Sequence, residues 1–310
     1  MSLSRAQGCL LGQLTGDALG SQVEFQSAKE IEINYPEGVR FLANGGTWGT
    51  LAGQPTDDSE MALILARAIV KNGAYNSTEV LKGYQFWLQS KPFDIGQTVA
   101  SGLNGQPNLD SQANGAMMRV SPLGIFGAHK PEADLIAWAK ADAALTHPNR
   151  LCQEANALYA LAIAQAIRLG PDPQTLYQSV ARWAEDWVVD PDLLEAVKKA
   201  KDYPPLQYSR QQGWVLIAFQ NALWQLLYAA NFEEALVDTV ERGGDTDTNG
   251  AICGALLGAV YGLETIPAQW REKVLNCRPQ SGQPGVRRPR PEVFWPVDAL
   301  ELAAQLLGES

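Results

Sequence analysis

Apolar residues recur every three to four positions through most of this chain, the spacing of amphipathic helices. The stretch from Asp57 to Gly73 is the clearest case, because Met61, Leu65 and Ala68 share one stripe between an acidic start and a glycine stop. Similar spacing predicts helices over residues 77–90, 132–146, 151–170, 173–188, 191–202, 213–230, 232–243 and 297–308. Strand-like alternation is brief everywhere, so we expect an all-α fold.

Two stretches interrupt this pattern. Residues 26–55 and 91–122 are rich in glycine and proline and read as coil. Neither has the length or composition of a flexible interdomain linker. We therefore expect one compact multi-helix domain over residues 1–310, with long functional loops.

Glycines recur every fourth residue in two further segments that are otherwise apolar and helical. They are Gly8, Gly12, Gly16 and Gly20, and then Gly250, Gly254, Gly258 and Gly262. A glycine inside a helix costs about 1 kcal/mol relative to alanine, so eight of them need a compensating reason. Helix dimerisation in a membrane is one alternative, but residues 251–263 are too short to span a bilayer. We favour close helix packing within a soluble core; if the two stripes meet each other, the ends of both helices lie deep in the protein.

Acidic clusters stand at the starts of two helical segments. The first is Thr56, Asp57 and Asp58, and the second is Asp245, Asp247 and Thr248. One interpretation is helix capping, which a single side chain would satisfy. The other is a metal site, because converging carboxylates repel one another unless a cation lies between them. All the donors are oxygens, which favours two Mg²⁺ or Mn²⁺ ions over zinc or copper.

Composition narrows the partners. The net charge of -10 disfavours nucleic acid, and the only basic stretch, Arg287 to Arg290, reads as a solvated surface loop. No apolar run is long enough to span a membrane, and the N-terminus lacks a signal-peptide layout, so we expect a cytoplasmic protein. Its four cysteines lie far apart and predict buried, reduced thiols.

Six motifs carry a family resemblance that spans nearly the whole chain. They are GDALGSQVEF (16–25), PTDDSEMAL (55–63), PFDIGQT (92–98), ANGAMMRVSPLG (113–124), LTHP (145–148) and GGDTDT (243–248). In this order they resemble the ADP-ribosylglycohydrolases, and most of all the bacterial members that release ADP-ribose from an arginine side chain. That family is all-α with a binuclear Mg²⁺ or Mn²⁺ centre.

The resemblance assigns residue roles by position. It implies that both acidic clusters are metal ligands, that Asp245 and Asp247 share a non-helical loop, and that Glu24 and Asp94 are catalytic carboxylates. Without it, Glu24 reads as a surface residue and Asp94 as part of a turn. Backbone amides of the loop around Asn114 would cradle the diphosphate, with a plain structural turn as the alternative. The implied substrate contacts are Ser111, Asn114, Gly115, Ala116, Met117 and His147.

On the nucleotide side of the implied site, His147 and Arg150 stand close together in the sequence. A lone histidine such as His147 is more often structural than a ligand contact. Arg150 stands where relatives commonly have proline or histidine, so the nucleotide side of the site departs from the family pattern.

The expected activity is the metal-dependent release of ADP-ribose from modified protein side chains, above all arginine, by a monomer. Serine-linked or O-acetyl-linked ADP-ribose is the alternative substrate. An inactive binding or structural relative is the third possibility, although such a protein would be expected to have lost metal ligands. Which carboxylate acts as the base stays open.

Overall fold

Helices form the regular structure in the computed structural model, which describes residues 1–187 and 189–309. In this part of the chain the extended backbone makes isolated bridges and no sheet. Residue 188, the end of the segment expected to be helical from residue 173, and residue 310 lie outside the described part. The α-helices are α1 (Ser2–Gly20), α2 (Ala28–Asn34), α3 (Asp57–Asn72), α4 (Ser77–Gln89), α5 (Gln97–Leu103), α6 (Ser121–Phe126), α7 (Glu132–Ala144), α8 (Arg150–Leu169), α9 (Pro173–Asp186), α10 (Pro191–Lys199), α11 (Val215–Tyr228), α12 (Phe232–Glu241), α13 (Thr246–Tyr261), α14 (Ala268–Leu275) and α15 (Ala299–Leu307). Four 3₁₀ turns are η1 (Met117–Arg119), η2 (Gly127–His129), η3 (Leu263–Thr265) and η4 (Glu292–Phe294).

The all-α prediction is confirmed, but the two stretches predicted as coil contain short helices. Helix α2 lies within residues 26–55 and α5 within residues 91–122, and each has seven residues. Two turns hold too few apolar positions to show a helical period. The sequence did contain one local signal, because Ser27 and Glu30 form a reciprocal capping box at the start of α2.

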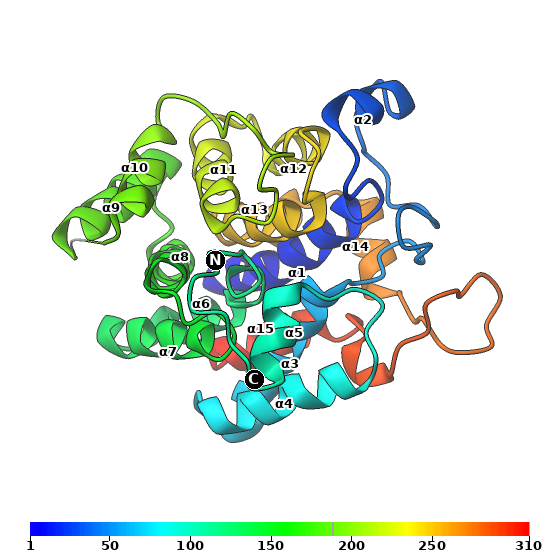
Figure 1. Ribbon diagram of the computed structural model, residues 1–310, viewed down its shortest axis with the longest axis horizontal. Coiled ribbons are helices and arrows are strands. Elements are labelled where there is room, and N and C mark those ends of the chain that lie inside the picture. The colour runs from blue at the N-terminus through cyan, green and yellow to red at the C-terminus, as the bar shows by residue number, and fades with distance from the viewer. Residues whose placement is uncertain (188, 310) are drawn as a thin grey trace.

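The glycine-rich helices α1 and α13 run antiparallel through the centre of the molecule (Figure 1). A Cβ placed on Gly12 would lie 2.2 Å from the carbonyl oxygen of Gly254, and one on Gly16 would lie 2.1 Å from that of Gly250. No real Cβ fits at such distances, so only glycine allows the two backbones to touch. The prediction of close helix packing in the core is confirmed, and the structure shows that the two stripes meet each other.

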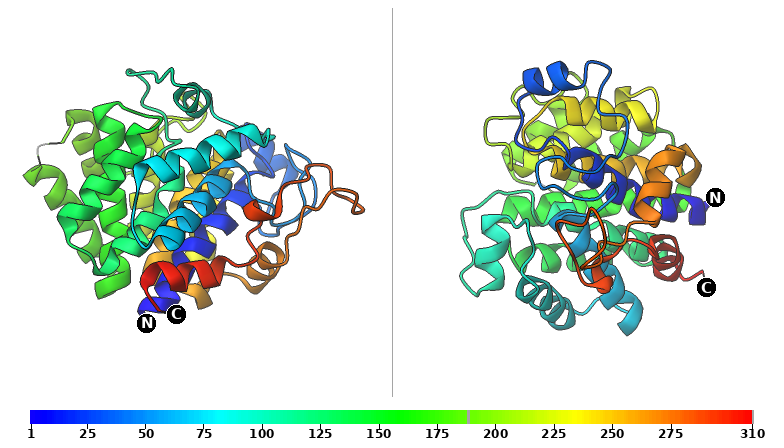
Figure 2. Two further views of the ribbon diagram at one scale, coloured as in Figure 1. Left: turned by 90° about the horizontal axis from the view of Figure 1, so that it is seen from below. Right: turned by 90° about the vertical axis from the view of Figure 1, so that its right-hand side faces the viewer.

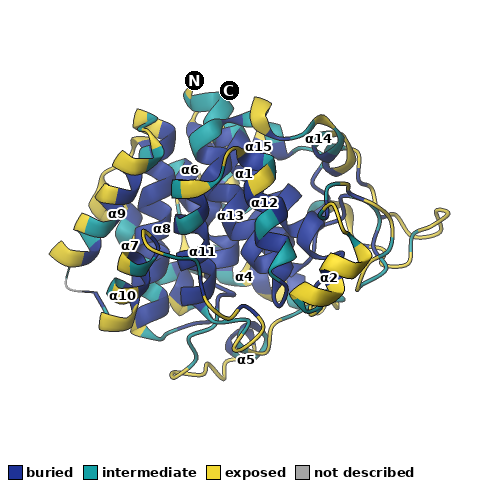
Figure 3. Cartoon of the chain, turned by 90° about the horizontal axis from the view of Figure 1, so that it is seen from above, coloured by how far each residue is buried: buried dark blue, intermediate teal, exposed yellow. Residues whose placement is uncertain are grey.

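Other helices surround this pair and bury it. In the two further views α1, in dark blue, runs from the edge of the molecule at the N-terminus inward among the other helices (Figure 2), and colouring by burial marks the central helices as buried, with exposed residues on α2, α9 and α10 (Figure 3). Polar side chains fix several contacts: the Tyr159 hydroxyl of α8 donates to the Ile252 carbonyl of α13 over 2.6 Å, and Gln7 of α1 reaches the Leu300 carbonyl of α15 over 3.3 Å. These hydrogen bonds fix the central pair to the helices around it.

The basic stretch near the C-terminal end is only partly the surface loop that we expected. Arg287 and Arg288 are exposed, but Arg290 is 6% exposed. Its guanidinium donates to both carboxylate oxygens of Glu60, over 2.8 and 2.7 Å, and Trp87 donates to the same carboxylate over 2.7 Å. No pattern in the sequence predicts this pairing, because Glu60 and Arg290 are 230 residues apart.

Two other expectations concern the surroundings of the protein. All four cysteines are free and buried, as predicted. Within the described residues, each helix is too short or too polar to serve as a membrane span.

Candidate functional site

A pocket of about 510 Å³ opens where α1 ends and where α3, α5 and α13 begin. Five carboxylates line it, from Glu24, Asp57, Asp94, Asp245 and Asp247. The described residues that line it include no lysine or arginine. The pocket therefore concentrates negative charge that no side chain of its wall neutralises.

The glycine contact places two of these carboxylates side by side. Gly20, at the end of α1, packs on the backbone of Thr246, and the Thr246 hydroxyl donates to the Gly20 carbonyl over 2.7 Å. Glu24 follows in the turn after α1, and Asp247 lies in the first turn of α13. Two residues more than 220 positions apart thus face the same space.

The start of α3 is capped by a residue from another helix. Asp17 of α1 is buried and accepts hydrogen bonds from the Thr56 amide, the Thr56 hydroxyl and the Ser59 amide, over 2.9–3.2 Å. Neither Thr56 nor Asp245, the residues at the N-cap positions of α3 and α13, makes a side-chain cap hydrogen bond. The capping interpretation of the two acidic clusters is therefore wrong for both N-cap residues, and the oxygens of Asp57 and Asp58 are not needed for it.

The second cluster differs from expectation in one respect. Helix α13 begins at Thr246, so Asp247 and Thr248 lie in its first turn and only Asp245 precedes the helix. The expectation that Asp245 and Asp247 share a non-helical loop is therefore wrong for Asp247. Both still line the pocket, because the first turn of a helix projects its side chains beyond the helix end.

Burial and mutual repulsion dominate the electrostatics of the pocket. Burial, followed by repulsion from neighbouring carboxylates, raises the pKa of Asp57 to about 7 and that of Asp94 to about 10. Burial likewise raises the pKa of Glu24 to about 8, although hydrogen bonds from Asp247 and Trp48 oppose the shift. The carboxylates of the wall therefore either stay protonated or need a bound cation to compensate their charge.

Three observations fit a hard divalent cation. Glu24, Asp94 and Asp247 each offer a carboxylate oxygen within 4.8 Å of the others. One oxygen of Asp58, Oδ1, is buried without a hydrogen-bond partner. The remaining donors are also oxygens, which suits Mg²⁺ or Mn²⁺. Only Asp247 belongs both to this close trio and to the ligand set implied by the family resemblance.

The loop around Asn114 is firmly tied to the pocket. The Asn114 side chain donates to Asp245 over 2.7 Å, and its amide donates to the Gly213 carbonyl over 2.9 Å. The amides of Met117 and Met118 both donate to the Asn114 carbonyl. Among the amides of residues 114–118, those of Gly115 and Ala116 have no acceptor within the described residues. Fewer amides of this loop are therefore free to bind a diphosphate than we expected.

His147 lines the pocket, and its Nδ1 lies 2.8 Å from the Thr146 hydroxyl, which itself accepts from the Arg119 guanidinium over 2.9 Å. In the tautomer in which this hydroxyl donates to Nδ1, the ring proton is on Nε2. Burial, with the nearby Arg119 charge, lowers the pKa of His147 to about 3, so the ring is neutral. Its Nε2 is buried without a partner, as expected of a group kept for a ligand.

Not every residue assigned from the sequence reaches the pocket. The residues of the implied site that line it are Glu24, Asp57, Asp94, Asn114, Gly115, His147, Asp245, Asp247 and Thr248. Thr56, Asp58, Ala116 and Met117 are buried behind the wall, and Ser111 bonds Thr98 over 2.8 Å. Sequence reasoning missed Asp17 and Trp48, whose indole N–H donates to Glu24 over 2.5 Å. A carboxylate between two stripe glycines was the available signal for Asp17, whereas Trp48 had none.

Comparison with known proteins agrees with this geometry. The family model described as ADP-ribosylglycohydrolase matches residues 2–307. The chain belongs to the ADP-ribosylglycohydrolase family. One relative, the ADP-ribosyl-[dinitrogen reductase] glycohydrolase of Rhodospirillum rubrum, is 32% identical over 87% of this chain and 90% of its own length. The ADP-ribosylarginine hydrolase Tri1 of Pseudomonas putida is 28% identical over 88% of this chain and 75% of its own.

A solved structure supports the same placement. The ADP-ribosylglycohydrolase-related protein complex superposes with a TM-score of 0.80 at 27% identity, covering 100% of this chain and 99% of that one. The fold predicted from the sequence is therefore confirmed as that of the ADP-ribosylglycohydrolase family, and a hydrolase that removes ADP-ribose is supported.

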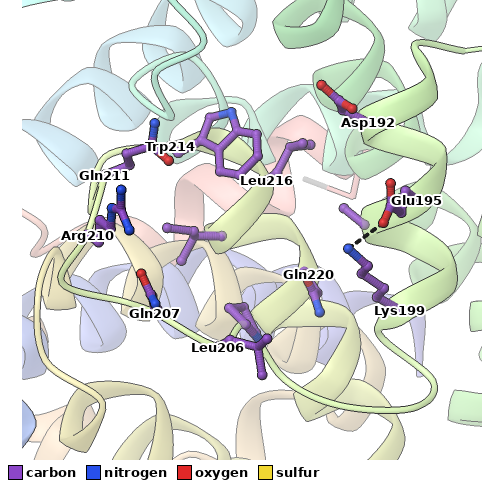
Figure 4. A pocket seen from close by; sticks show the side chains of 13 residues that line it. Asp192, Glu195, Lys199, Leu206, Gln207, Arg210, Gln211, Trp214, Leu216 and Gln220 are labelled. Atoms are coloured by element: carbon purple, nitrogen blue, oxygen red, sulfur yellow. Dashed lines mark ion pairs between the residues drawn. The ribbon is translucent and has the colours of Figure 1, made fainter.

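The chain has another pocket of about 490 Å³ between α10, the start of α11 and the segment joining them (Figure 4). The carboxylates on its wall are Asp192 and Glu195, and Glu195 forms an ion pair with Lys199. Its charges are thus largely compensated, unlike those of the carboxylate-lined pocket. The two pockets are similar in size, so chemistry and not volume marks the site.

Proposed function

We propose that this chain is a metal-dependent hydrolase that releases ADP-ribose from modified protein side chains, with arginine as the preferred linkage. The observation that carries the proposal is the convergence of Glu24, Asp94 and Asp247 in a pocket without a lining lysine or arginine. Such a wall suits cations, both metal ions and a substrate guanidinium. We expect the enzyme to act as a cytoplasmic monomer.

The two acidic clusters would hold a pair of Mg²⁺ or Mn²⁺ ions. The ligands of this proposal are Thr56, Asp57, Asp58, Asp245, Asp247 and Thr248, and the unpartnered Oδ1 of Asp58 supports it. When bound, the ions would supply positive charge that orients ribose hydroxyls and water. An inactive relative would be expected to lack some of these six side chains, and all are present.

The chemistry of the bond defines what the protein side chains must do. Cleavage between ribose C1 and a side-chain atom passes through an oxocarbenium-like state, which a nearby carboxylate stabilises. The indole N–H of Trp48 donates to Glu24 and holds it in place. A carboxylate oxygen of Asp94 lies within 4.8 Å of one of Glu24. Either carboxylate can take the proton of the attacking water.

The nucleotide half of the substrate needs donors, because the diphosphate is anionic and the protein carries a net charge of -10. The Gly115 amide and Nε2 of His147 lie on the wall without a hydrogen-bond partner, and the Ala116 amide, just behind the wall, also has no acceptor among the described residues. We assign them to substrate oxygens. Ser111 would act indirectly, through its hydrogen bond with Thr98 on the pocket wall.

The proposed preference for the arginine linkage can be tested, because arginine and serine leave as chemically different groups. A carboxylate pairs with a guanidinium through charge-assisted, often bidentate hydrogen bonds, which a serine hydroxyl cannot form. We therefore expect Asp94→Asn to lose most of the activity on ADP-ribosyl-arginine while it retains Mg²⁺ and free ADP-ribose binding. The measurement is ADP-ribose release from arginine-, serine- and O-acetyl-linked substrates. Faster release from the serine-linked peptide would overturn the assignment and make Glu24 the principal candidate.

A further inference from the structure

Three aromatic rings stand next to the two candidate catalytic carboxylates. The ring centres of Phe25 and Trp48 are 6.4 Å apart at 76°, and those of Trp48 and Phe93 are 6.0 Å apart at 54°. Phe25 directly follows Glu24 in the chain, Phe93 directly precedes Asp94, and Trp48 donates to the Glu24 carboxylate. We call this group, Phe25, Trp48 and Phe93, the aromatic rim.

Phe25 is held in a costly position. Its side chain is 55% exposed although it is large and apolar, and its φ of 66° lies in the left-handed region. That region is unfavourable for a residue with a Cβ. The backbone is kept there by the Phe25 amide, which donates to the Gly244 carbonyl, next to Asp245, over 2.8 Å. Strain of this kind persists where the surroundings enforce it, and it concentrates at functional sites.

The rim already contacts a guanidinium. Arg288 lies with its Cζ 5.8 Å from the centre of the Phe93 ring, and its Nε donates to the Trp48 carbonyl over 2.9 Å. An arginine over an aromatic ring is attracted by the negative face of that ring. Phe25 belongs to the wall of the carboxylate-lined pocket, so its ring is available to a group that enters.

We propose that the aromatic rim receives the guanidinium of ADP-ribosylated arginine and stacks on it beside Glu24 and Asp94. This inference rests on the proposed function and adds the residues that select the linkage. A guanidinium is a planar cation that can stack on a ring while its edge faces a carboxylate. A serine-linked substrate presents neither the plane nor the charge, so it gains nothing from the rim.

The test separates ring chemistry from bulk. Phe25→Leu keeps an apolar side chain and removes the ring, whereas Phe25→Tyr keeps a ring. For an arginine-linked peptide we expect Phe25→Leu to raise KM about fivefold with kcat little changed, because the variant loses the cation–π contact with the guanidinium. Phe25→Tyr should restore the original KM. Phe41→Leu, at a phenylalanine that is 71% exposed, is the matched control and should change neither constant.

The serine-linked peptide and free ADP-ribose supply the other arms of the test. Phe25→Leu should leave the KM of the serine-linked peptide unchanged, or its inhibition constant where it is not cleaved, together with the affinity for free ADP-ribose. The proposal that the aromatic rim selects the linkage would be overturned by any of three results. These are an equal rise in KM for both linkages, a fall confined to kcat, or an unaltered KM for the arginine-linked peptide. A wild-type preference for serine would instead refute the proposed function, so the two failures are distinguishable.

Discussion

Asp17 and Asp58 show how similar buried carboxylates take different roles. Asp17 accepts hydrogen bonds from Thr56 and Ser59 and so replaces the cap that α3 lacks. Asp58 keeps Oδ1 without a partner, and burial with repulsion from neighbouring carboxylates raises its pKa well above the usual range. A buried oxygen without a partner costs free energy unless a ligand satisfies it. The first aspartate is structural, and the second is suited to a cation.

At this scale we predict metal dependence. Asp57→Asn and Asp247→Asn should each lower ADP-ribose release by orders of magnitude while the helical circular-dichroism signal persists, because each removes a charged ligand from the proposed centre. Chelation of the wild type should abolish activity, and added Mg²⁺ or Mn²⁺ should restore it. Full activity in excess EDTA would sink the prediction.

The effect of metal on stability should also depend on pH. The pKa values of about 7 for Asp57 and 8 for Glu24 exceed the unfolded values of about 4, so the metal-free folded state binds more protons than the unfolded state. Its stability therefore falls as pH rises from about 4 to 8. Metal binds the deprotonated form, so Mn²⁺ should raise Tm more at pH 8 than at pH 6. Thermal scans with and without metal measure this, and a shift independent of pH would contradict it.

At the scale of elements, the pairing of α1 with α13 controls the geometry of the pocket. The helices meet along their glycines, and their adjoining ends carry Glu24 and Asp247. From the middle of α1, the Gln13 amide donates to the carbonyls of Asp58 and Met118 over 3.2 and 2.9 Å. One helix thus contacts three of the segments that build the site.

We expect Gly12→Leu and Gly254→Leu each to destabilise the fold by several kcal/mol, because even a Cβ at either position would lie within 2.2 Å of the facing carbonyl oxygen. The higher helix propensity of leucine gains back only about 1 kcal/mol. Urea unfolding provides the measurement. The matched control is Ala133→Leu on the exposed face of α7, which should change stability little. Unchanged melting temperatures for both glycine variants would mean that the stripes do not pack as described.

At the scale of the whole molecule, residues far apart in the chain support the site together. Arg290 pairs with Glu60, two residues after Asp58, and Arg288 donates to the Trp48 carbonyl. Trp48 in turn donates to Glu24. The C-terminal segment therefore stabilises both the start of α3 and the loop that carries Trp48.

Removing one partner of the buried pair should be costly. Arg290→Met leaves Glu60 buried without its counter-charge, so we expect a loss of about 3–5 kcal/mol in unfolding free energy. The double variant Arg290→Met with Glu60→Gln should lose less than the sum of the two single changes, because the uncompensated charge is gone. Chemical denaturation of the four proteins checks this. Additive losses would show that the pair does not interact.

The sequence by itself determined the helical class, most of the longer helices, the close packing expected of the glycine stripes and the positions of the acidic clusters. These features depend on local spacing along the chain, and the ordered motifs tied them to one family. Asp94, Asn114 and His147 were found in the same way, and the structure brings them to the pocket.

Only the tertiary structure decided which of these groups share a space. The cap that Asp17 gives α3, the indole beside Glu24, the Glu60–Arg290 pair and the aromatic rim each join residues that approach one another only after folding. Short helices such as α2 and α5 were missed because two turns hold too few apolar positions to show a period. Hydrophobic periodicity predicts which face of a helix is buried. It does not predict which other segment packs against that face, because this depends on the packing of the whole molecule.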